Sequence, residues 1–164
     1  MHDPVGPAWL VWLETSAIAA AMRQDLWLYP IVEIVHILGF VVLVGSAAMF
    51  DARLLGWSRR LSVGAMARHL LPWARGALLV VAPSGALLFS AHATEMAANP
   101  AFRLKIAFLA MAGLNAALFH RGPFKSVQAW DHDAPAPTSA KLAALLSLVL
   151  WAGVLTCGRL LAYL

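Results

Sequence analysis

Two ionisable side chains, Glu33 and His36, lie one helical turn apart in a long apolar run from Leu26 to Arg53. The run is close to the roughly 20 apolar residues that a membrane-spanning helix needs. Ionisable groups are costly in hydrocarbon, so those inside spans face the protein interior and mark ion paths, proton relays or ligand sites. What Glu33 and His36 point at is therefore the main question that the sequence raises about function.

Imidazole and thioether groups both bind haem iron as axial ligands. At a rise of 1.5 Å per residue, His36 lies about 14 Å and Met111 about 16 Å below the membrane surface near Trp27. A haem held by His36 and Met111, or by His36 with an open or water-filled sixth position, fits these depths. The alternative for Met111 is core filling, the commoner use of methionine.

A second haem position is predicted near the opposite surface, where His69 begins one span and His120 ends another. Facing imidazoles are the ligands of a bis-His b-type haem. The cations close enough to receive its propionates are Arg68, Arg75 and Arg121. The alternative is that both histidines are interfacial and bind nothing. Pairing His36 with His120 would need about 12 Å of depth offset, which straight helices do not absorb.

The same depth count places Glu33, Lys105 and Arg159 at about 8 to 9 Å from the outer surface, on three different spans. We predict a charge network among them, which either locks helix register or holds an anionic group such as a haem propionate. Asp51 and Arg53, at the end of the first span, are assigned to the same network.

Glu33-x-x-His36 also matches the pattern of carboxylate-bridged di-metal sites in helix bundles. Such a site needs a second Glu-x-x-His and two further Glu residues. Besides Glu33 the chain has only Glu14 and Glu95, and neither lies in a predicted span. This excludes a di-iron site and leaves Glu33 as an acceptor that orients His36 or as part of a proton path.

The elements that must position these residues are all predicted to be helices in one membrane domain over residues 1–164. We expect an interfacial amphipathic helix over about 7–24, with a re-entrant segment as the alternative. Four spans follow, over about 26–50, 70–91, 101–120 and 142–163. Pro72, Pro83 and Gly85 predict a kink in the second span. The expected fold class is an all-α, integral membrane four-helix bundle.

Composition supports this class. The 164 residues are 62% hydrophobic and 12% charged, about half the charge of a soluble domain. The net charge of +4 is attributed to basic loops rather than to nucleic-acid binding. A single cysteine, Cys157, excludes a disulfide framework and a Cys-x-x-Cys metal pair. The N-terminus lacks signal-peptide features, so we expect uncleaved insertion.

Basic residues set the expected orientation. They concentrate in the loops after the first and third spans, which predicts that these loops are cytoplasmic and that both termini are periplasmic. The composition, rich in Ala, Leu, Arg and Trp, is typical of high-GC bacteria, so the expected location is a bacterial inner membrane. Many Gly and Ala residues in the spans favour close helix contacts and a homo-oligomer.

Several segments resemble a family of small bacterial four-helix integral membrane proteins of unknown function. They are LWLYPIVEIVHILG, FDARLLGW, LLPW, SGALLF, NPAFRLKIAFLAMAGLNAALFH and GRLLAYL, and together they cover nearly the whole chain. FRLKIAFLAMAGLN is also similar, more weakly, to copper-resistance D-type membrane domains and to four-helix membrane b-type cytochromes. The resemblance implies functional or architectural roles for Glu33, His36, Asp51, Arg53, Lys105, Asn115, His120 and Arg159. His69 and His92 lie outside its pattern.

The function predicted from these residues is a bacterial inner-membrane b-type haem protein, a membrane cytochrome with one or two haems. It would transfer electrons between quinone, or a periplasmic redox partner, and an acceptor. His36 and His120 are the first candidate ligands, with His69 as the partner of His120. The cations that balance propionates or intramembrane acids are Lys105, Arg159 and Arg75. The sequence leaves open whether the chain itself catalyses an oxidoreductase reaction.

Two alternatives belong to other functional classes. In the first, Glu33, His36 and Met111 line a path for copper or protons through a membrane transporter. In the second, the protein is a cofactor-free oligomer whose charges only fix helix register. The histidines and the intramembrane charges are common to all three hypotheses, so only their three-dimensional arrangement separates them.

Overall fold

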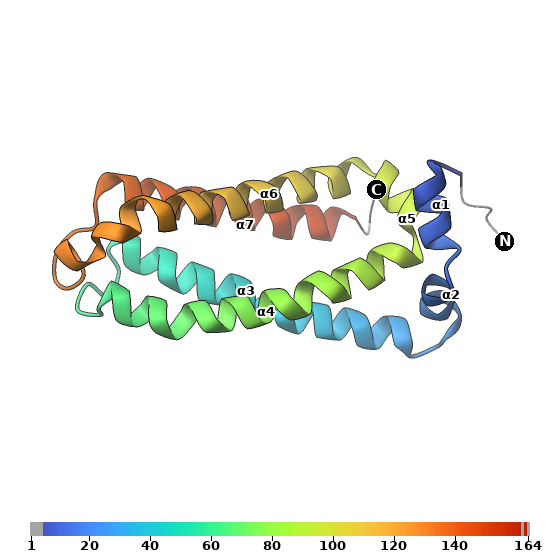
Figure 1. Cartoon of the computed structure of the whole chain (residues 1–164), viewed down its shortest axis with the longest axis horizontal. Helices are drawn as coiled ribbons and strands as arrows, with labels where there is room; N and C mark the ends of the chain where they lie inside the picture. Colours follow the sequence, from blue (N-terminus) through green and yellow to red (C-terminus); the bar gives the residue numbers. More distant parts are fainter. Residues whose placement is uncertain (1–4, 162, 164) are drawn as a thin grey trace.

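The computed structural model describes residues 5–161 and 163, and the regular elements in this part of the chain are all helices (Figure 1). In chain order they are α1 (Ala8–Glu14), α2 (Ala17–Gln24), α3 (Leu28–Leu55), α4 (Val63–Ala91), α5 (Ala93–Ala98), α6 (Pro100–Arg121), the 3₁₀ helix η1 (Pro123–Ala129) and α7 (Thr138–Leu160).

The four long helices α3, α4, α6 and α7 are each long and apolar enough to span a membrane, with mean hydropathies of 2.2, 1.5, 1.5 and 1.9. At most 28% of the residues in any of these apolar windows are buried inside the protein. Most of the apolar side chains therefore lie on the outside, where they match the hydrocarbon of a bilayer. This confirms the predicted all-α, multi-pass, four-helix architecture.

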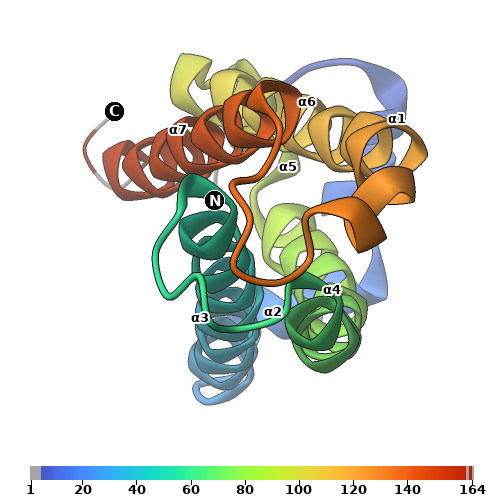
Figure 2. The same cartoon turned by 90° about the vertical axis from the view of Figure 1, so that its left-hand side faces the viewer.

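The spans form two helical hairpins. Helix α3 packs along α4, α6 packs along α7, and the hairpins are joined through α3 and α7 (Figures 1 and 2). Two glycines allow the close approach within the hairpins. A Cβ atom on Gly39 would lie 2.9 Å from a methyl group of Val81, and one on Gly153 would lie 2.7 Å from the ring of Phe108.

One end of the bundle holds its main apolar core. We call it the basic end, because the α3–α4 loop, η1 and the flanking turns carry Arg59, Arg60, Arg68, Arg121 and Lys125. Its core consists of Phe50, Leu54, Val63, Ala67, Phe119, Trp130, Ala136, Ala140 and Ala144. The rings of Phe50 and Phe119 meet edge to face, with centroids 5.9 Å apart. The loops at this end therefore pack directly against the helices.

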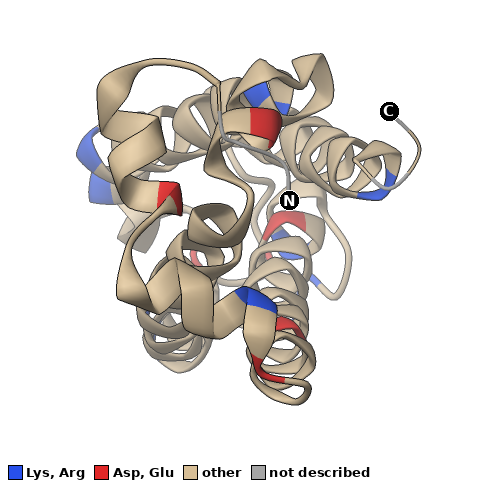
Figure 3. Ribbon diagram, turned by 90° about the vertical axis from the view of Figure 1, so that its right-hand side faces the viewer, with Lys and Arg blue, Asp and Glu red and all other residues tan. Residues whose placement is uncertain are grey.

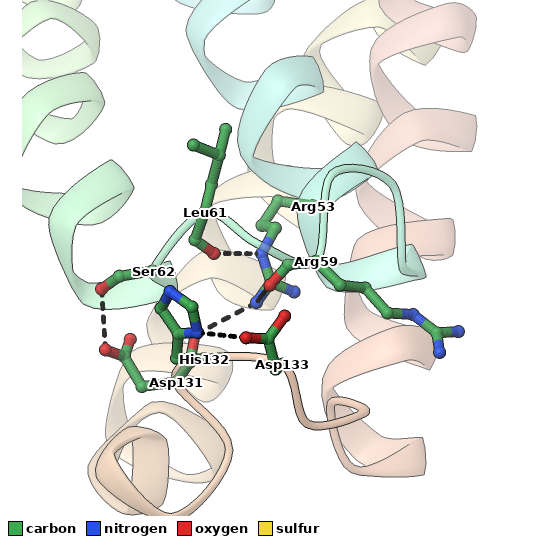
Figure 4. Close-up of polar contacts among 7 residues, drawn as sticks. All are labelled: Arg53, Arg59, Leu61, Ser62, Asp131, His132 and Asp133. Atoms are coloured by element: carbon green, nitrogen blue, oxygen red, sulfur yellow. Dashed lines mark hydrogen bonds and ion pairs between the residues drawn. The ribbon is translucent and has the colours of Figure 1, made fainter.

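Arg53, at the end of α3, ties these loops together (Figure 4). Its side chain is only 2% exposed. The Nε–H donates to the carbonyl oxygen of Leu61 at 2.6 Å, and Nη2 donates to the carbonyl oxygens of Arg59 and Asp131, each at 3.0 Å. One guanidinium thus satisfies acceptors in the α3–α4 loop and in the segment between η1 and α7.

The side chain of Asp131 completes the junction from the other side. Its carboxylate accepts from the backbone N–H of Gly64 at 2.6 Å and from the hydroxyl of Ser62 at 2.7 Å, while Ser62 caps α4. These hydrogen bonds, first of all the one from Gly64, hold the pKa of Asp131 below its ordinary value. The carboxylate therefore stabilises the N-terminus of α4, where a negative charge is favourable.

The opposite end carries the short helices α1, α2 and α5, and side chains of both charge signs (Figure 3). Glu14 of α1 accepts two hydrogen bonds from Thr94 of α5, through the backbone N–H at 2.8 Å and the hydroxyl at 2.7 Å. Burial alone would raise the pKa of Glu14, but these bonds and the nearby Arg23 hold it below its ordinary value. Arg23 also donates to the carbonyl oxygen of Ala91, at the end of α4.

Several element boundaries differ from the sequence prediction. The single helix expected over 7–24 is two helices, because Ser16 interrupts the first and caps the second. α4 begins at Val63 rather than near residue 70, because Ser62 caps it there, and α4 runs through Pro72 and Pro83 without a break. α5 and η1 were expected to be loops. The predicted end of the fourth span, at residue 163, includes residue 162, which lies outside the described residues.

The Arg53 junction makes a prediction about stability. Arg53→Met keeps much of the side-chain volume but leaves the carbonyl oxygen of Leu61 without a donor and removes one of the two donors to the carbonyl oxygens of Arg59 and Asp131. We therefore expect the free energy of unfolding to fall by about 2 kcal/mol. Thermal unfolding in detergent measures this loss. Arg60→Met, at an exposed position in the same loop, is the matched control and should change the melting temperature little. Equal melting temperatures for the two variants would contradict the role assigned to Arg53.

Asp131 makes a prediction about pH. Its folded pKa lies below its unfolded pKa, so its stabilisation is complete above the ordinary carboxyl range and is lost as pH falls through the folded pKa. Asp131→Asn should therefore lower stability by about 1 kcal/mol at neutral pH and by much less in acid. Melting temperatures across this pH range test the prediction, with the exposed Asp133→Asn as control. A constant difference between wild type and Asp131→Asn would refute it.

Candidate functional site

The imidazole of His36 lies between α3 and α4, near the middle of the bundle. Its Nδ1 is 3.1 Å from the carbonyl oxygen of Val81 and 3.0 Å from the hydroxyl oxygen of Ser84. Ser84 is buried, and its own hydroxyl donates to the carbonyl oxygen of Val80 at 2.7 Å. The ring is therefore fixed by a side chain and a backbone group of the neighbouring helix.

This contact determines which ring nitrogen of His36 is free. A carbonyl oxygen only accepts hydrogen bonds, and the single hydroxyl proton of Ser84 is directed to Val80, so the arrangement is satisfied when Nδ1 carries the proton and donates to Val81. Nε2 then holds the lone pair. Within the described part of the chain Nε2 has no hydrogen-bond partner, and it is not among the buried unpaired atoms, so it reaches the surface of the protein. An imidazole held at Nδ1 by a carbonyl and open at Nε2 is the usual arrangement of a metal-binding histidine.

Gly85 forms one wall of the space that the His36 ring occupies. A Cβ atom at position 85 would lie 3.0 Å from Cε1 and 3.5 Å from Nδ1 of His36. Phe40, one turn along α3, stacks beside the imidazole with a centroid distance of 6.4 Å and an interplanar angle of 19°. The ring of Trp151 on α7 meets Phe40 edge to face at 5.9 Å. Residues of three spans thus fix the position of the imidazole.

Two charged residues lie in the neighbourhood of His36 without contacting it: Lys105 of α6 and Glu33 of α3. Lys105 is partly buried, and its Nζ lies 3.7 Å from the Cβ position of Gly158 on α7. All four spans therefore contribute charged, hydrogen-bonding or packing residues to the surroundings of His36. We call these residues the His36 site: Glu33, His36 and Phe40 of α3, Val81, Ser84 and Gly85 of α4, Lys105 of α6 and Trp151 of α7.

The predicted charge layer does not form by direct contact. Glu33 is exposed, and no ion pair joins it to Lys105 or Arg159; the ion pair found among residues 5–161 and 163 is His132 with Asp133, at 2.7 Å. Arg159, in the last turn of α7, donates to the hydroxyl of Tyr163 beyond the end of the helix and lies 4.7 Å from the centre of that ring. Equal depth in the membrane did not bring these side chains to one place.

Met111 does not share a side of α6 with the His36 site. It is 44% exposed. Phe102 of the same helix stacks on Phe89 of α4, with centroids 5.1 Å apart, which shows the side of α6 that faces α4. Met111 is nine residues later, about two and a half turns, and so lies on the other side. The structure gives no support to a ligand pair of His36 and Met111.

His69 and His120 have different surroundings, and no contact joins them among the described residues. His69 is exposed on α4. His120 packs among aromatic rings at the basic end, with centroid distances of 5.3 Å to Phe119 and 5.2 Å to Phe124. Its Nδ1 is 2.8 Å from the carbonyl oxygen of Ala116, one turn back, and its Nε2 is buried without a partner. The structure places His120 half-buried against the core of the basic end and shows no bis-His pair among the described residues.

The remaining predicted residues either hold helices and loops together or lie on the surface. Arg53 forms the junction at the basic end, and Asn115 donates to the carbonyl oxygen of Ala143 on α7 at 2.9 Å. Asp51 is only 6% exposed, faces Ser147 of α7, and has one carboxylate oxygen without a partner. Arg75 is exposed on α4 beside a groove. Asp51 and Arg53 are therefore close in sequence but serve different contacts.

Ser84 and Gly85 were not identified as site residues from the sequence. Gly85 was considered only as a source of a kink, together with Pro83. The signal that was present is a small polar residue followed by glycine inside a span, which marks a close approach between helices. Which side chain of α3 approaches there depends on how α4 is rotated, and sequence patterns do not fix that rotation.

The described residues contain no group of three or more His, Cys, Asp or Glu side chains that could hold a metal ion. The fold and the site define a small multi-pass membrane protein with one open imidazole in the middle of its bundle. The chain belongs to the family described as a family of unknown function (DUF6644), which matches residues 9–164. This confirms the predicted relation to a family without an assigned activity.

Comparisons with curated proteins and with solved structures gave no match. The weaker resemblance to copper-resistance D-type domains and to b-type cytochromes therefore has no support beyond the residues that suggested it.

Two glycines of α4 test the wall of the His36 site. Nothing lies within 4 Å of a Cβ atom at Gly76, so Gly76→Ala should stabilise the helix by about 0.5–1 kcal/mol. Gly85→Ala gains the same helix propensity but pushes against the His36 ring, so it should be neutral or destabilising. Thermal unfolding of the two variants checks this difference. Equal stabilisation would show that the imidazole does not occupy the position described.

Proposed function

We propose that this protein is a membrane haem protein that takes part in electron transfer, with one b-type haem bound through Nε2 of His36. The observation that carries the proposal is the state of the imidazole. Nδ1 is fixed by the carbonyl oxygen of Val81, while Nε2 is unpaired and accessible. A preset tautomer and a fixed ring plane reduce the cost of binding a metal centre.

A haem suits this donor set better than a bare metal ion. A porphyrin supplies four of the ligands of its iron, so one or two protein ligands are enough. A copper or zinc site needs several converging side chains, and the described residues offer no such group. For this reason a metal path lined by Glu33, His36 and Met111 is not the function that the geometry favours.

A haem group would supply one-electron redox chemistry, and the chain's own residues would position it. His36 would fix the iron, and Ser84 with Val81 would keep the ring oriented and basic. Lys105 is the cation near His36 and the best candidate partner for a propionate. Arg159 and Arg75 are not assigned to this haem site, because Arg159 contacts Tyr163 and Arg75 lines a separate groove beside α4. Quinone or a periplasmic protein remains the proposed redox partner.

One haem rather than two is proposed. A second site would need His69 and His120 as a pair, but His69 is exposed and the Nε2 of His120 is enclosed by aromatic rings. We keep the bacterial inner membrane with periplasmic termini as the proposed location, because the basic end matches a cytoplasmic surface. A homo-oligomer also stays a proposal. Open space beside Gly45 and Gly113 leaves room for a helix of a second copy.

The test is the visible spectrum of the protein purified in detergent from cells supplied with a haem precursor. We expect a Soret band that sharpens on reduction with dithionite, together with an alpha band. His36→Ala should lose most of the bound haem, because its only fixed ligand is removed. His69→Ala, a histidine exposed on α4, is the matched control and should keep the spectrum of the wild type.

Ser84→Ala separates binding from orientation. It retains the ligand but removes one acceptor for Nδ1, so haem should bind and its midpoint potential should shift. Wild-type protein without haem under these conditions, or an unchanged spectrum in His36→Ala, would refute the proposed function.

A further inference from the structure

A groove of about 480 Å³ lies between the first half of α4 and η1, away from the His36 site. Its walls are mostly apolar and come from Ala67, Leu71 and Pro72 of α4 and from Phe124 and Val127 of η1. Arg68 and Arg75 are its two charged lining residues. The groove thus combines an apolar surface with two cations, which is the chemical character of a site for an anionic amphiphile.

Both arginines face the same groove because they are seven residues, or two turns, apart on α4, which separates their Cα atoms by about 10 Å. Helical side chains lean toward the N-terminus of their helix, which for α4 is the basic end. Arg68 shows this lean directly, since its Nη1 is 3.5 Å from the Cβ position of Gly64, one turn back. Both guanidinium groups are therefore directed toward the membrane surface at that end.

Neither guanidinium is neutralised within the described part of the chain. No ion pair or hydrogen bond involves the side chain of Arg68 or Arg75 there. The carboxylate of Asp131 also lies next to Gly64, but it already accepts from Ser62 and from the backbone of Gly64. Two exposed and unpaired arginines beside an apolar groove can bind an anionic partner, and the bilayer supplies one in its anionic lipids.

We propose that this groove binds an anionic phospholipid. The phosphodiester headgroup lies between Arg68 and Arg75, and the start of an acyl chain runs over Leu71, Pro72 and the η1 residues. Guanidinium groups match phosphate oxygens with two parallel hydrogen bonds. The basic residues around the groove attract anionic lipids of the cytoplasmic leaflet to this end. The bound lipid would join η1 to α4, and the site is independent of the haem proposed at His36.

The test compares lipid binding by native mass spectrometry of the purified protein. Phosphatidylglycerol and phosphatidylcholine with the same acyl chains are added separately, and inorganic phosphate is added as a third arm. We expect a clear preference for phosphatidylglycerol and no competition from inorganic phosphate at the same concentration. Each arginine near an anionic headgroup contributes about fivefold in affinity, so Arg68→Gln with Arg75→Gln should lose about 25-fold.

The matched control is Arg60→Gln with Arg121→Gln, which removes the same charge from exposed positions at the same end but outside the groove. It should keep most of the affinity. Equal losses in both double variants would overturn the site in favour of diffuse attraction. Equal binding of the two lipids, or displacement by inorganic phosphate, would overturn it as well. If the double variant at Arg68 and Arg75 does not fold, the two single variants give the same comparison.

Discussion

The structure depends most on one guanidinium group, that of Arg53. In a bilayer every polar backbone group that is not in a helix must find a partner inside the protein or in the interface. The α3–α4 loop and the segment before α7 leave the helical pattern, and carbonyl oxygens of both segments accept hydrogen bonds from Arg53. Because these segments belong to different hairpins, the same group that satisfies the loops also fixes how the two hairpins meet at the basic end.

The middle of the bundle is held in a different way. Within each hairpin the two helices approach each other at a glycine, Gly39 against Val81 of α4 and Gly153 against Phe108 of α6. The polar contacts there are few, chiefly His36 with Val81 and Ser84, and Asn115 with Ala143. Such contacts fix rotation about the helix axis more than they add stability, since a hydrogen bond between spans contributes only about 1 kcal/mol. The site at His36 is therefore rigid at its Nδ1 side and open at Nε2.

The sequence predicted the spans well because bilayer thickness fixes their length and hydropathy marks them directly. It predicted the ends less well. α4 starts early because Ser62 caps it, and α5 exists because Thr94 meets Glu14 from a distant helix. For the site, residue type alone singled out His36. Depth counting also selected Met111, a choice that the structure does not support, because depth says how far along a span a residue lies and not which side it faces.

Because depth does not fix which way a side chain faces, polar residues at the same depth make separate contacts. The depth of a residue is set by its position along the span, and the direction it faces is set by the rotation of the helix about its axis. Residues of equal depth meet only if their helices are rotated toward each other. Glu33, Lys105 and Arg159 share a depth, yet Arg159 turns to Tyr163 and Lys105 leans toward Gly158. His36 differs because Gly85 leaves room for its ring and the hydroxyl oxygen of Ser84 accepts a hydrogen bond from its Nδ1. That pairing of an opening with an acceptor on the facing helix, rather than the presence of an imidazole in a membrane, is what fixes the orientation of the His36 ring.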